Sequence, residues 1–68
     1  MTDQLNTLAQ RVKKLRLERD WSQAQLAEKI GANPSVIGNI ERRNSKSTEY
    51  AEQLADVLEV DLAWLLTG

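Results

Sequence analysis

The feature that most limits the fold of this 68-residue chain is a pair of short helix patterns joined by a glycine turn. Ser22 and Gln25 match a Ser-x-x-Gln capping box, in which two side chains satisfy free backbone N–H groups where a helix begins. The box predicts a helix over about residues 23–30. Gly31 follows directly, and glycine readily takes the left-handed conformation that ends a helix. A tight turn is therefore expected at this point.

A second short helix is expected directly after the turn. Asn33 and Pro34 suit an N-cap and a first helical position, because proline lacks only an N–H that has no partner there. The pattern continues to about Arg42. Small or apolar residues stand where the two helices would cross: Leu26, Ala27, Ile30, Ile37 and Ile40. This combination predicts a helix-turn-helix over about residues 22–43, whereas a generic helical hairpin, the alternative, needs only the apolar residues.

One helical pattern precedes this pair and two follow it. A first helix is predicted over about residues 3–19 from apolar residues at steps of three and four: Leu5, Leu8, Val12 and Leu15. Thr48 is expected to cap a helix over about residues 49–58, and Asp61 a short one over residues 62–66. In the last helix the residues expected to close the core are Trp64 and either Leu65 or Leu66. With no strand pattern, repeat or linker, the chain is predicted to form one compact, all-α, five-helix domain over residues 1–68.

The composition excludes several classes of function. The chain has no cysteine and no histidine, so disulfides, thiolate nucleophiles and most metal sites are not expected. No base, nucleophile or metal cluster converges, and a chain of this length leaves little room for a substrate pocket, so an enzyme is the weakest alternative. No cofactor is expected. The chain also shows no membrane span and no signal peptide, which predicts a cytoplasmic protein.

Charge is distributed unevenly along the chain. The formal net charge is -1, but residues 1–46 carry nine basic and five acidic side chains, whereas residues 47–68 carry five acidic and no basic ones. Such a division favours one face that binds an anionic partner. The alternative is that these charges belong to ordinary solvated helix surfaces.

Two separate segments resemble the DNA-binding domains of lambdoid phage CI and Cro repressors and of the wider XRE-type bacterial regulators. They are QAQLAEKIG, at residues 23–31, and VDLAWLLTG, at residues 60–68. The resemblance implies a lambda-repressor-like fold that binds double-stranded DNA sequence-specifically as a phage or bacterial transcriptional repressor or regulator. It also implies a homodimer on a palindromic operator, in the cytoplasm or nucleoid of a bacterial host.

In this family the helix that corresponds to residues 34–42 enters the major groove. The resemblance therefore implies base readout by residues on its outward face and first turn: Asn33, Pro34, Ser35, Gly38, Asn39 and Arg42. Asn39 is the strongest candidate, because a carboxamide can pair with both N6 and N7 of adenine. Pro34 offers only apolar contact, and Gly38 indicates a close approach of the backbone to the groove edge. The alternatives are an ordinary surface asparagine and a neutral glycine.

Phosphate contacts are expected around this helix. Gln23 matches a family glutamine that hydrogen-bonds a phosphate and braces the reading helix, and the N-terminus of its own helix also attracts anions. Further phosphate contacts are assigned to Arg11, Lys13, Arg43 and Lys46. Each of these cations has the alternative of a solvated surface charge. Glu49, near the loop, would repel a phosphate.

Two other sets of residues follow from the resemblance. Arg16 and Glu41 occupy the positions of a partly buried structural ion pair. Leu62, Leu65 and Thr67 correspond to a dimer contact, although simple core packing is the alternative for the two leucines. An antitoxin or regulator that acts mainly through protein partners is the alternative function. Both a fragment of a longer repressor and a complete Cro-like protein remain open.

Overall fold

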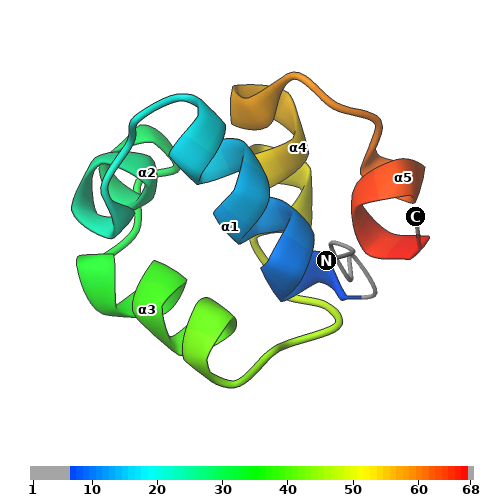
Figure 1. Cartoon of the computed structure of the whole chain (residues 1–68), viewed down its shortest axis with the longest axis horizontal. Coiled ribbons are helices and arrows are strands. Elements are labelled where there is room, and N and C mark those ends of the chain that lie inside the picture. The colour runs from blue at the N-terminus through cyan, green and yellow to red at the C-terminus, as the bar shows by residue number, and fades with distance from the viewer. Residues whose placement is uncertain (1–6, 68) are drawn as a thin grey trace.

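Five helices and no strands follow one another along residues 7–67, the part of the chain that the computed structural model describes (Figure 1). They are α1 (Leu8–Glu18), α2 (Gln23–Lys29), α3 (Pro34–Arg42), α4 (Ala51–Leu58) and α5 (Leu62–Thr67). Figure 1 shows α1 in the middle, with α2 and α3 on one side and α5 on the other. The prediction of an all-α, five-helix fold is confirmed.

Capping boxes set the starts of α1 and α2. The Ser22 hydroxyl accepts from the Gln25 backbone N–H at 3.0 Å, and the Gln25 side chain accepts from the Ser22 N–H at 2.7 Å, as predicted. The predicted start of the first helix is wrong. Thr7 has an extended backbone (φ -128°) and forms a second capping box with Gln10, so α1 begins at Leu8. The residues before Thr7, with the apolar Leu5, lie outside the described part.

Left-handed residues follow four of the helices. Gly31 has a φ of +72° after α2, as the turn pattern predicts. The other three are not glycines: Asp20, Asn44 and Glu59, with φ between 54° and 59°. Each lets the chain leave its helix sharply, so that short connections can bring all five helices together.

The start predicted for the fourth helix is also wrong. α4 begins at Ala51, because Thr48 forms a turn before the helix and does not cap it. The Thr48 hydroxyl accepts from the Tyr50 backbone N–H at 3.3 Å, and the Thr48 carbonyl accepts from the Ala51 N–H at 3.1 Å. The loop between α3 and α4 is therefore two residues longer than expected.

The core lies around α1, whose apolar side meets α3, α4 and α5. Its largest fully buried side chains come from all five helices: Leu8, Val12, Leu26, Ile37, Leu54, Leu58 and Leu65. Leu65 has no exposed surface, whereas Trp64 is 37% exposed, so Leu65 closes the core and the prediction for Trp64 is wrong. None of the described helices is long and apolar enough to span a membrane.

Candidate nucleic-acid interface

An ion pair joins α3 to α1. Arg16 Nε donates to Glu41 Oε2 at 2.9 Å and Arg16 Nη2 donates to Oε1 at 3.0 Å, a bidentate geometry. The third guanidinium nitrogen, Nη1, donates to the Trp21 carbonyl at 2.8 Å. The two charged side chains are only 9% and 7% exposed, so this is the structural pair that the resemblance implies between these positions.

A glutamine from α2 completes this support. Gln23 Nε2 donates to Glu41 Oε1 at 3.0 Å, so one carboxylate at the end of α3 is bound by both α1 and α2. A side chain at Gly38 would place its Cβ 3.4 Å from Gln23 Oε1. This is an ordinary van der Waals contact with the end of a flexible side chain, so packing against α2 does not require a glycine, and the close approach to the groove edge stays a prediction. We refer to Arg16, Gln23 and Glu41 as the α3 brace.

The predicted base readers lie along the solvent-exposed side of α3 and at its first turn. Four of them are exposed, namely Asn33, Pro34, Ser35 and Arg42, and Gly38 and Asn39 are partly exposed. Asn33 is the N-cap by its extended backbone, but its side chain makes no capping hydrogen bond. Arg42 Nη2 donates to Asn39 Oδ1, which joins two of the candidates. The outer surface of α3 is thus polar and accessible.

The basic residues expected to contact phosphates divide into two groups. Lys13, Arg43 and Lys46 are exposed. Arg11 is only 3% exposed: its Nη1 donates to the Leu65 carbonyl at 2.8 Å, and its guanidinium lies 5.9 Å from the centre of the Trp64 ring. Assigning Arg11 to a phosphate contact is therefore wrong, because this side chain ties the last turn of α5 to α1.

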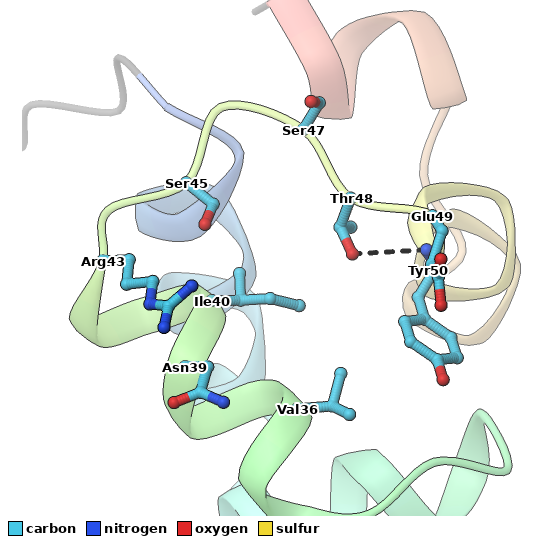
Figure 2. A pocket seen from close by; sticks show the side chains of 9 residues that line it. All are labelled: Val36, Asn39, Ile40, Arg43, Ser45, Ser47, Thr48, Glu49 and Tyr50. Carbon is cyan, nitrogen blue, oxygen red and sulfur yellow. Dashed lines mark hydrogen bonds between the residues drawn. The ribbon is translucent and has the colours of Figure 1, made fainter.

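A groove of about 340 Å³ separates α3 from the loop that leads to α4 (Figure 2). In Figure 2, Asn39 and Arg43 stand on the α3 side, and Glu49 and Tyr50 face them from the loop. The apolar side chains of Val36 and Ile40 also line it, with Ser45, Ser47 and Thr48. Sequence reasoning missed Val36 and Tyr50. Val36 stands one helical turn before Asn39, a spacing that could have placed the two on neighbouring faces.

The loop is anchored to the start of α1. The Ser45 N–H donates to the Ile40 carbonyl at 3.1 Å, and the Ser45 carbonyl accepts from the Ala9 N–H at 3.0 Å. Thr7 Oγ1 also donates to Asn44 Oδ1 at 2.8 Å. These bonds fix the path of the chain beyond α3, where Ser45 lines the groove.

The residues expected at a dimer contact do not share one environment. Leu62 is half-buried against the core, and Thr67 is exposed, with its hydroxyl donating to the Ala63 carbonyl at 2.7 Å. Leu65 is fully buried, so its assignment to a contact between copies is wrong. Its side chain belongs to the core of the protein itself.

Residues 12–65 match the family described as helix-turn-helix. The chain is 36% identical over 61 residues to the HTH-type transcriptional regulator SinR of Bacillus subtilis, covering 87% of this chain and 55% of SinR. It is 30% identical over 64 residues to the repressor protein CI of Enterobacteria phage phi80, covering 94% of this chain and 27% of that repressor. The chain thus spans about half of one curated relative and about a quarter of the other.

Solved structures show the same arrangement of helices. The crystal structure of SinR in complex with DNA superposes with a TM-score of 0.76 at 35% identity, over 88% of this chain and 98% of that one. The P22 c2 repressor in complex with a synthetic operator superposes with a TM-score of 0.79 over 90% and 94% of the two chains. At 21% identity, the second likeness shows the fold alone.

Proposed function

Because the chain belongs to the helix-turn-helix family of XRE-type DNA-binding transcriptional regulators, we propose that α3 enters the major groove of an operator and selects its sequence. The α3 brace carries this proposal. It holds the helix through Glu41, and none of the predicted base readers belongs to the hydrophobic core. Membership of a family of regulators also confirms the prediction that the chain is not an enzyme.

The domain assignment is part of the proposal. Residues 22–43 are proposed to form the DNA-binding unit within one domain that extends over residues 1–68. Pro34, Ser35, Asn39 and Arg42 are proposed to meet base edges, and the Asn33 side chain, which the cap does not use, stands beside them. The protein would act where the chromosome of a bacterial host lies, in the cytoplasm or nucleoid.

Phosphate contacts are proposed for the exposed cations near α3, which are Lys13, Arg43 and Lys46. Gln23 is proposed to join them, because its Nε2 donates one N–H to Glu41 and carries a second N–H that a phosphate can accept. Such contacts hold the protein on any duplex and release counterions, and they carry no sequence information.

Replacing Lys46 by alanine is expected to weaken binding to all duplex sequences alike and to lower the slope of log K against log salt by about 1. Lys29→Ala is the matched control, since Lys29 lies in the last turn of α2 and its Nζ is 4.6 Å from the centre of the Trp21 ring, a cation–π contact. Fluorescence anisotropy at several salt concentrations measures both slopes. An unchanged slope in Lys46→Ala would remove this residue from the interface.

Two copies are proposed to bind one palindromic operator. A single reading helix contacts only a few base pairs, too few to select a site among many genomic competitors. The half-buried Leu62 and the exposed Thr67 on α5 remain available for a contact between copies. With Leu65 withdrawn into the core, this contact is small, so the free protein is expected to be monomeric at micromolar concentration.

The operator is expected to have half-sites about one helical turn apart. Inserting about five base pairs between the half-sites should abolish cooperative binding, because half a turn puts the two sites on opposite faces of the duplex. Sedimentation with each duplex measures the stoichiometry. Equal one-to-one binding to a lone half-site and to the spaced operator would contradict the dimer.

Selection from randomised duplexes tests the proposed function itself. A conserved motif among the bound sequences, with affinity that falls as salt rises, is the expected result. Binding without any enriched motif would instead favour the second candidate, a regulator or antitoxin that acts mainly through protein partners. The selected duplex then serves the experiments on individual residues.

A further inference from the structure

We propose that Asn39 and Arg42 act as one unit that reads a guanine in the major groove. The inference rests on the proposed function of α3 and specifies the base that its outer face accepts. It also replaces the expectation that Asn39 alone pairs with adenine. The observation that carries it is the hydrogen bond from Arg42 Nη2 to Asn39 Oδ1.

The two side chains meet because they lie three residues apart on one helix. Side chains on a helix lean towards its N-terminus, so Arg42 in the last turn of α3 reaches back over Asn39. A guanidinium has donors and no acceptor, so the amide atom that faces it must be the oxygen. The orientation of the Asn39 amide therefore follows from its partner.

This orientation decides which groups remain for a base. The Asn39 oxygen is bound by a cation, while its NH₂ group and the other N–H groups of Arg42 remain as donors. The pair thus offers donors side by side. The Asn39 oxygen keeps a second lone pair, but this lone pair lies next to the positively charged guanidinium. The partly positive hydrogens of a base amino group would be repelled there.

Guanine is the base whose major-groove edge suits such a pair. Its N7 and O6 are both acceptors, whereas adenine presents the N7 acceptor beside the N6 amino donor. If adenine faced the Asn39–Arg42 pair, its N6 amino donor would meet one of the two protein donors, and no hydrogen bond could form there. An isolated asparagine would favour adenine, so the arginine reverses the preference.

The surroundings leave Arg42 available for this role. The carboxylate of the adjacent Glu41 is already bound by Arg16 and Gln23, and it does not compete for the Arg42 guanidinium. Asn39 is the hydrogen-bond partner that the described part of the chain offers Arg42, and the arginine is exposed. A base can therefore approach the pair from the outer side of α3.

The test compares single and double variants on the selected duplex and on duplexes with each base pair at the candidate position. Asn39→Ala and Arg42→Ala should each lower affinity for the guanine duplex by about 5-fold to 150-fold, the range of one bidentate base contact, with little change for the others. The double variant should lose little beyond either single one, because the two act together. Arg43→Ala is the matched control, an exposed neighbouring arginine expected to weaken all duplexes alike.

Two further measurements distinguish recognition of the guanine from simple attraction of the Arg42 charge to DNA. Arg42→Lys keeps the charge without the planar fork, so it should retain binding to random DNA and lose the preference for guanine. Replacing the guanine by 7-deazaguanine removes the N7 acceptor and should weaken the wild-type protein several-fold while leaving Arg42→Ala unchanged.

The outcomes that overturn the proposal differ from those that overturn the function. An adenine at the position that depends on Asn39, or a uniform loss in Arg42→Ala, would show that the two residues do not form a guanine-reading pair. Both results presuppose that the protein binds DNA in a sequence-dependent way, so they leave the proposed function intact. If no motif is enriched from random duplexes, the proposed function itself fails.

Discussion

Replacing Glu41 by alanine is expected to lower the free energy of unfolding by about 3 kcal/mol or more. The change leaves the Arg16 guanidinium in a site where only 9% of its side chain is exposed, with its carboxylate partner gone. It also removes the acceptor of the Gln23 amide. The expected loss is large because the guanidinium stays buried and poorly hydrated, and the carboxylate that compensated for its lost hydration is gone.

Urea unfolding followed by circular dichroism measures this loss. Glu18→Ala is the control, since Glu18 forms an exposed pair with Lys14 on α1 and its removal should change stability little. A loss below about 0.5 kcal/mol for Glu41→Ala would show that the pair is solvated and contributes like a surface pair. Binding to random DNA should weaken only to the extent that the protein unfolds.

Replacing Leu65 by alanine is expected to cost about 2 to 5 kcal/mol of stability, the range for a buried leucine that leaves a cavity. Leu65 is fully buried at the junction of α5 with the rest of the core. A loss at the upper end would unfold a domain of this length at room temperature, because small domains have little stability to spare.

Leu62→Ala is the matched control for this experiment, since Leu62 is the same residue type on the same helix and is only half-buried. It should destabilise the protein less than Leu65→Ala does. Thermal unfolding at two protein concentrations separates core packing from assembly. If Leu65→Ala left the monomer as stable as the wild type and weakened only a concentration-dependent species, Leu65 would be a contact between copies after all.

Signals that act within a few residues could be predicted from the sequence. The capping box at Ser22 and the left-handed Gly31 depend only on their neighbours in the chain, and both are where the pattern placed them. The same Thr-x-x-Gln signal stands at Thr7 and Gln10, but the apolar stripe that includes Leu5 suggested an earlier start. A local capping signal was therefore more informative than the length of the stripe.

Features that depend on how the helices pack could not be predicted in the same way. Arg11 is basic and lies near the start of α1, which favours a surface role, yet it is covered because α5 packs over it. The pattern of a six-residue helix predicted Trp64 in the core and did not distinguish Leu65 from Leu66, whereas the structure buries Leu65 and leaves Trp64 exposed. The bond between Arg42 and Asn39 depends on a choice of rotamer, which residue type alone does not determine.

The placement of the α3 brace has an evolutionary consequence. Arg16, Gln23 and Glu41 hold α3, whereas Pro34, Ser35, Asn39 and Arg42 take no part in this brace and do not belong to the hydrophobic core. Mutations at these four positions are therefore expected to change the surface proposed to meet base edges while the folded domain keeps its stability. If α3 selects the operator as proposed, one copy of a duplicated gene can acquire a new target through a few substitutions, and no compensating change in the core is required.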